Sequence, residues 1–241
     1  MSWVTATPLL ALAAALLITG CESTQDKSAR LEKTGGAATR EKGLRISKES
    51  SDVKVTGTAV IADANGAAAV VELRNTTERA LARVPLAIDV TDGARSLFKN
   101  DEPGLEPSLV GVPTLPAGGS LAWVNDEILS EGKAKAVKAT VGADSGRAPA
   151  DLPRVEVGRP TLRRDPTSGL AAEGKIVNRS KVLQRELTLF AVARKGERIV
   201  AAGRGQVERL KAGKTARYQI FFIGNPRGAR IEIAAPPTNL K

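Results

Sequence analysis

From Val53 onward, apolar and polar residues alternate in short runs that are separated by Gly, Asn, Asp and Pro. The alternation is clearest over Val84–Val90, and it ends at the turn-forming sequence Thr91-Asp92-Gly93. A period of two is typical of a β-strand with one buried face, whereas an amphipathic helix needs a period near 3.6. The runs recur roughly every 8–12 residues, the spacing of strands in a small antiparallel sandwich. The pattern therefore predicts an all-β protein.

The second half of the chain repeats the pattern of the first half. Between the two copies, the alignment needs one length difference: the first copy is longer by 8 residues between Lys99 and Thr114. This repeat predicts two tandem immunoglobulin-like antiparallel β-sandwich domains, over residues 53–144 and 150–241, each with one large aromatic core residue. The aligned pairs include Asn75 with Asn178, Leu86 with Leu189, Gly93 with Gly196, Leu115 with Leu210, and Trp123 with Tyr218.

The first 52 residues have a different pattern. Leu9–Ile18 is an apolar run that is too short to cross a bilayer core, which needs about 20 residues, and it is typical of a secretory signal peptide. The run leads through Thr19-Gly20 to Cys21, the only cysteine of the chain. The sequence Ile18-Thr19-Gly20-Cys21 resembles the lipobox of bacterial lipoproteins. This resemblance implies a signal peptide over residues 1–20 and a diacylglycerol anchor, with palmitate-type acyl chains, on Cys21.

Residues 22–52 lack a sustained apolar period and are rich in charged and small residues, so we expect residues 21–52 to form a lipidated cysteine followed by a flexible linker. Glu22 stands where an Asp, in many bacteria with two membranes, marks retention at the inner membrane. The lipobox resemblance thus implies an extracytoplasmic protein anchored to a bacterial membrane, with the outer membrane favoured where there are two.

The repeat itself resembles the FxLYD-type and related immunoglobulin-like modules that occur in tandem in envelope lipoproteins. The resemblance rests on the strand-ending Asn75, on Ile88-Asp89-Val90-Thr91-Asp92, and on the turn Leu115-Pro116-Ala117-Gly118. In the second copy, Ala191–Lys195 departs from the name-giving motif in almost every letter. The resemblance implies an architecture and no catalytic residues.

Composition narrows the function further. The chain has no histidine, and the lipobox resemblance assigns its one cysteine to the lipid. Histidine is the commonest general acid–base residue and metal ligand near neutral pH, so we expect a protein that is not an enzyme and has no cofactor and no metal site of the usual kind. Aromatic residues make up only 3% of the chain. That scarcity, together with the export sequence, argues against a nucleic-acid partner.

Two acidic pairs are candidate ligand residues in the first copy. Asp101 and Glu102 lie in the extra segment, and Asp126 and Glu127 follow Trp123. If both loops lie at one end of the sandwich, their oxygens suit a calcium ion or a small ligand. The alternative is a pair of solvated polar loops.

Charge is distributed unevenly between the copies. Residues 53–144 contain 9 basic and 12 acidic side chains, whereas residues 145–241 contain 20 basic and 8 acidic ones. The second copy therefore offers a candidate patch for an anionic surface, although a merely solvated basic face explains the same counts. The candidate residues are Arg163, Arg164, Arg209, Lys211 and Lys214.

These observations lead to two hypotheses. The first is a non-catalytic, lipid-anchored cell-envelope protein that binds or scaffolds other envelope components. Its partners are the membrane, through the lipid, and envelope proteins or an anionic polymer. The alternative is a receptor for a small ligand or calcium that uses the acidic loops of the first copy.

Overall fold

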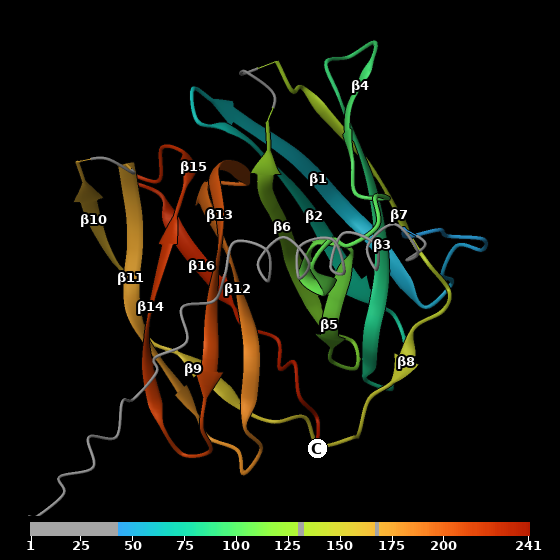
Figure 1. Cartoon of the computed structure of the whole chain (residues 1–241), viewed down its shortest axis with the longest axis vertical. Helices are drawn as coiled ribbons and strands as arrows, with labels where there is room; N and C mark the ends of the chain where they lie inside the picture. Colours follow the sequence, from blue (N-terminus) through green and yellow to red (C-terminus); the bar gives the residue numbers. More distant parts are fainter. Residues whose placement is uncertain (1–42, 130–132, 167–168) are drawn as a thin grey trace, which may run out of the picture. The chain divides into compact units, whose positions relative to one another are not determined.

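The computed structural model describes residues 43–129, 133–166 and 169–241 (Figure 1). In these ranges the regular structure is antiparallel β-sheet, and the one helical element is a short 3₁₀ turn, η1 (Pro107–Leu109). The all-β prediction is confirmed. No helix in the described ranges is long and apolar enough to cross a membrane.

The first half contains two sheets. One sheet has the order β1-β2-β6, and in the other β3 is the central strand, paired with β4, β5, β7 and β8. Side chains of both sheets join one buried cluster, so this half is a β-sandwich. The strands are β1 (Val53–Asp63), β2 (Gly66–Asn75), β3 (Leu81–Thr91), β4 (Ser96–Lys99), β5 (Gly111–Leu115), β6 (Ser120–Ile128), β7 (Ala136–Val141) and β8 (Gly146–Arg147).

The second half has the same plan. Strands β10-β11-β14 form one sheet with β9 beside β11, and β15-β13-β12-β16 form the other. Between them lies a second buried cluster that includes Ile176, Leu189 and Tyr218. The strands are β9 (Val155–Val157), β10 (Thr161–Asp165), β11 (Gly169–Asn178), β12 (Gln184–Lys195), β13 (Arg198–Leu210), β14 (Thr215–Phe221), β15 (Ile223–Gly224) and β16 (Arg230–Ala234).

The backbone confirms the repeat that the sequence predicts. Strand β11 begins and ends 103 positions after β2. Arg83 and Glu186, also 103 positions apart, are the two non-glycine residues with positive φ in the described ranges, at 49° and 48°. Such a conformation is uncommon in non-glycine residues, so its recurrence at one aligned position shows that the two halves share a backbone plan.

The extra segment of the first half interrupts one strand. In the second half, β13 runs unbroken along β12 from Arg198 to Leu210. In the first half the same place beside β3 is divided into β4 and β5, with η1 between them. The buried Asn100 fixes the interruption, because its Nδ2 donates to the carbonyl oxygens of Leu86 and Leu109, each at 2.8 Å.

The two halves also share buried surface. Six consecutive residues of β2, Gly66–Val71, are buried. Val71 lies opposite Trp123 in β6, whereas Val70 lies opposite Val124, so these two pairs point to opposite faces of the sheet. The cluster of the first half includes Phe190 and other residues of β12 and β13. Strand β2 is therefore covered on both faces, which explains an apolar run where a half-exposed strand would alternate.

The segment before β1 contacts the sandwich as well. The Ser50 N–H donates to the Val141 oxygen, and the Ala143 N–H donates to the Lys48 oxygen, at 2.8 and 2.9 Å. Residues 48–50, near the end of the expected linker, are thus bonded to the segment around the end of β7. Residues 41–241 together form one compact unit.

Both aromatic residues predicted as core anchors are buried. Trp123 has no exposed surface, and its Nε1 donates to the Ser108 oxygen at 2.8 Å. Tyr218 is 4% exposed, its ring lies against Gly174, and its hydroxyl donates to the Gly158 oxygen at 3.0 Å. We expect Trp123→Ala and Tyr218→Ala each to lower the free energy of unfolding by about 3–5 kcal/mol, because each leaves a large cavity.

The measurement is urea unfolding followed by circular dichroism. Tyr218→Phe is the matched control, since it keeps the ring and removes only one hydrogen bond, at a cost of about 1 kcal/mol. Unfolding midpoints that do not move in either alanine variant would contradict the assignment of these residues to the core.

Candidate functional site

The structure separates the two acidic pairs predicted as ligand residues. Asp101 and Glu102 are exposed in the segment after β4, whereas Asp126 and Glu127 lie near the end of β6. No hydrogen bond or ion pair joins one pair to the other in the described part of the chain. Asp126 and Glu127 instead contact Arg204, which comes from β13 in the second half.

Arg204 is surrounded by acceptors from the first half. Its backbone N–H donates to Asp126 Oδ2 at 2.7 Å, and its Nη2 donates to Glu127 Oε1. Its Nη1 donates to Glu106 Oε2 at 3.0 Å and to Ser108 Oγ at 2.6 Å. Glu106 and Ser108 belong to the extra segment of the first copy. That segment, which the sequence marks by length alone, is therefore a docking loop for the second half.

Burial governs the electrostatics of this cluster. The Arg204 side chain is only 9% exposed, whereas those of Glu106 and Glu127 are more than half exposed. Burial raises the pKa of Asp126 above its usual value of 3.8, and Arg204 opposes that shift by hydrogen bonding and by charge. Among the described residues, no group of three or more His, Cys, Asp or Glu side chains is arranged to hold a metal ion.

A second set of polar contacts also joins the halves. Arg194 of β12 donates to Glu72 in β2 and to Glu232 in β16, and its side chain is 12% exposed. Asp63 Oδ2, at the end of β1, accepts the N–H of Gly224 at 2.8 Å. Together with the Arg204 cluster, these contacts hold the two halves at a mixed apolar and ionic interface.

The five residues of the predicted anionic-surface patch do not form one cluster. Arg163 and Arg164 lie in β10, opposite Ala171 and Leu170 near the start of β11. Lys211 and Lys214 flank the β13–β14 turn, beside the other end of β11, and Arg209 lies near the end of β13. These two groups lie beside opposite ends of β11, about six residues or roughly 20 Å apart along the strand.

Two further cations, Lys175 and Arg217, lie between those ends. Arg163 pairs with Glu173 at 3.1 Å, and Gln219 donates to the same carboxylate, so these three side chains share the outward face of the sheet. Two positions along that face, Lys175 lies directly opposite Arg217, and both are exposed. No ion pair of either side chain is present among the described residues. Like charges in opposed positions destabilise a sheet, so this pair carries an unused attraction for anions.

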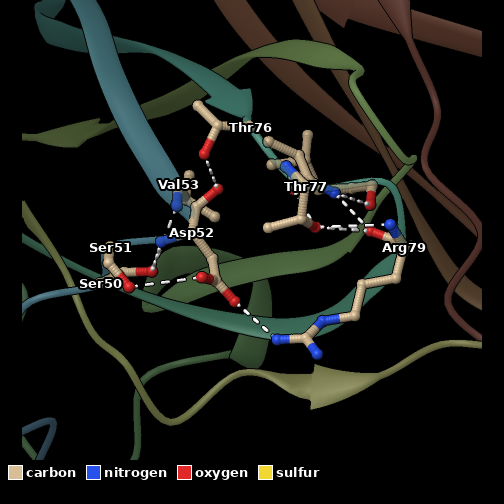
Figure 2. Close-up of polar contacts among 9 residues, drawn as sticks. Ser50, Ser51, Asp52, Val53, Thr76, Thr77 and Arg79 are labelled. Atoms are coloured by element: carbon tan, nitrogen blue, oxygen red, sulfur yellow. Dashed lines mark hydrogen bonds and ion pairs between the residues drawn. The ribbon is translucent and has the colours of Figure 1, made fainter.

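Side-chain hydrogen bonds hold the β2–β3 turn of the first half (Figure 2). The buried Asn75 donates through Nδ2 to the Arg79 oxygen at 2.7 Å, and its Oδ1 accepts from the N–H and the hydroxyl of Thr77. Asn178 makes the same bonds to Val182 and Ser180 in the second half. The aligned asparagines therefore fix the same turn twice.

Arg79 is the charged residue that this turn presents. Its Nη2 donates to Asp52 Oδ2 at 2.8 Å, and Asp52 in turn lies directly before β1 (Figure 2). Arg79 also borders a pocket of about 600 Å³, which lies between this turn, the β5–β6 turn at Pro116 and Ala117, and the segment from Arg147 to Leu152. A cavity of this size is within the range of small-ligand sites.

Cys21, the predicted lipidation site, lies outside the described residues. Neither a family model nor a curated protein sequence matches the chain. The excess of basic over acidic side chains in residues 145–241 directs attention to the second half, which contains the basic sheet face. The Arg204 contacts were not predictable in this way, because its partners lie 77 to 98 positions away in sequence.

The Arg204 cluster gives a prediction about pH. Arg204→Gln removes the cation and leaves Asp126 in its buried place, so we expect a loss of about 2–3 kcal/mol of stability at pH 7. This is below the 3–5 kcal/mol of a fully buried pair, because the partner glutamates are half exposed. Without Arg204 the pKa of Asp126 rises further, so the variant's carboxyl takes up a proton more readily on folding.

The sign of the pH effect follows from this proton uptake. A carboxyl with a raised folded pKa contributes most to stability below its unfolded pKa, and this contribution is lost as the pH rises through the folded pKa. The stability difference between wild type and Arg204→Gln should therefore be smaller at pH 4 than at pH 7, as measured by urea unfolding at both values. Arg198→Gln, at an exposed position at the start of β13 whose side chain makes no ion pair among the described residues, is the control. An equal difference at both pH values would contradict the prediction.

Proposed function

We propose that this protein is a non-catalytic, lipid-anchored component of a bacterial cell envelope, and that it binds an anionic polymer through the outward face of the β10-β11-β14 sheet. The observation that carries the binding proposal is the exposed pair of opposed cations, Lys175 and Arg217. The lipid anchor is supported by the lipobox resemblance at Cys21 and by the polar segment that follows it.

The remaining charges support this choice of face. Glu156 is shared by Arg154 and Arg179, and Glu173 by Arg163, so the acidic residues of this sheet face are already paired. The charged side chains of this face that remain without an ionic partner among the described residues are therefore positive. An extended anionic polymer suits such a face, because its charges repeat along a line, as do the rows of a sheet. Binding of this kind weakens as salt is added.

The alternative of a calcium or small-ligand receptor at the acidic loops has less support. Asp126 and Glu127 already have Arg204 as a partner, and Asp101 and Glu102 lie apart from them as an exposed pair. We therefore place the binding function on the second half.

The anchor proposal predicts the fate of a Cys21→Ser variant. A serine hydroxyl cannot form the thioether, so palmitate labelling of the protein should disappear and the unprocessed precursor should accumulate. The measurement is metabolic labelling followed by gel electrophoresis. If the serine variant still takes up labelled palmitate, the lipid is attached elsewhere.

The binding proposal predicts that Lys175→Glu combined with Arg217→Glu weakens retention on immobilised polyphosphate. Each cation near an anionic surface contributes about 1 kcal/mol, so reversing two of them should lower the affinity by at least about tenfold. The readout is the salt concentration at which the purified full chain elutes.

The first half supplies a control with the same change in net charge. Lys54 lies opposite Arg74 in β1 and β2, and both are exposed. Lys54→Glu combined with Arg74→Glu should leave elution close to that of the wild type, because these two cations lie in the half that has more acidic than basic side chains and therefore attracts the polymer less. Equal losses in the two double variants would mean that net charge alone matters, and the sheet face would then not be the binding site.

A further inference from the structure

The pocket beside Arg79 is lined by two turns of the first half and by the segment from Arg147 to Leu152 that leads into the second half, and it is separate from the polymer-binding face. Its apolar part is formed by small or branched side chains, with Ala80 and Ala148 buried and Leu152 packed against them. Its charged part consists of Glu78, Arg79 and Arg147, all exposed. An apolar lining with a few charged groups is the usual composition of a small-ligand site.

The repeat shows which of these residues the architecture needs. Both halves keep the asparagine turn, with the same hydrogen bonds. At the aligned positions of the second half, however, Lys181 replaces Glu78, Val182 replaces Arg79 and Leu183 replaces Ala80. Since the turn forms without them, the charges and the small Ala80 are not required by the fold.

The second half also closes the equivalent place with its own chain. In the first half, the Ala80 oxygen accepts the N–H of Ala148 at 3.1 Å. In the second half, the aligned oxygen of Leu183 accepts from Asn239 Nδ2 at 3.0 Å. Leu183, which is larger than Ala80, thus occupies the equivalent position and is hydrogen-bonded to the C-terminal segment. In the first half, Leu240 of the C-terminal segment also packs against the cluster that contains Ala80 and Ala148, and the small side chains leave the pocket beside it.

Arg79 and Arg147 both have side-chain N–H groups that make no hydrogen bond among the described residues. Arg79 uses Nη2 for Asp52, which orients the guanidinium, while its Nε and Nη1 make no hydrogen bond among the described residues. The side chain of Arg147, at the end of β8, makes no hydrogen bond or ion pair in the same ranges. A guanidinium with free N–H groups binds a carboxylate through two parallel hydrogen bonds.

Glu78 restricts the kind of anion. Its carboxylate borders the same pocket, so it repels a dianion such as phosphate and accepts hydrogen bonds from N–H groups. A peptide that ends in a free carboxylate offers one negative charge, amide N–H donors and, with small residues, an apolar body. We propose that this pocket binds the free carboxyl terminus of a short peptide of small aliphatic residues, with Arg79 and Arg147 on the carboxylate.

The test is calorimetric titration of the purified full chain with acetyl-Ala-Ala-Ala, compared with the same peptide as its C-terminal amide. The free acid should bind, and the amide should bind at least about tenfold more weakly, because it lacks the charge that the arginines recognise. Equal affinities, or no binding of the free acid at millimolar concentration, would overturn the proposal.

Two variants locate the site. Ala80→Leu introduces the residue of the second half and fills the pocket, and Arg147→Gln removes one cation. Each should weaken binding of the free acid by at least about tenfold, whereas Arg95→Gln, an exposed arginine elsewhere in the first half, should not. Circular dichroism checks the fold. If Ala80→Leu does not fold, Arg147→Gln alone decides, and unchanged affinity in a folded variant refutes the site. Retention on polyphosphate is measured in parallel, so a failure here is distinguishable from a failure of the basic face.

Discussion

The burial of β2 on both of its faces is the constraint on which the rest of this structure depends. One face packs inside the first sandwich around Trp123, and the other is covered by β12 and β13. An apolar strand face of this kind is costly to expose, so the two halves are held together through it. Arg194 and Arg204 then add charged contacts around this shared surface, where their low exposure requires carboxylate partners.

This constraint accounts for the distribution of charge. Carboxylates of the first half, including Glu72, Asp126 and Glu127, are drawn to arginines of the second half. Part of the basic excess of the second half lies on the β10-β11-β14 sheet, where Lys175 and Arg217 are opposed. The difference in charge between the halves thus has two consequences. It favours attraction at the interface, and it leaves an unpaired basic face elsewhere.

The repeat separates what the architecture needs from what each half adds. The asparagine turns, the left-handed Arg83 and Glu186, and the large buried aromatic residues occur in both copies. The docking loop around η1, the residues Glu78, Arg79 and Ala80 beside the pocket, and the opposed pair of Lys175 and Arg217 have no counterpart at the aligned positions of the other copy. We therefore assign the residues that recur in both copies to the stability of the fold, and we seek binding residues at the positions that differ between the copies.

The sequence by itself determined the strands, the repeat and the buried aromatic residues, because the period of two and the turn residues are local properties of the chain. It also located the uneven charge and the extra segment. It did not determine that Arg204 would lie among Glu106, Asp126 and Glu127, that the predicted basic patch would be divided between two ends of a sheet, or that Lys175 would face Arg217. Those outcomes depend on strand register and on packing between residues far apart in the chain, and only the tertiary structure decides them.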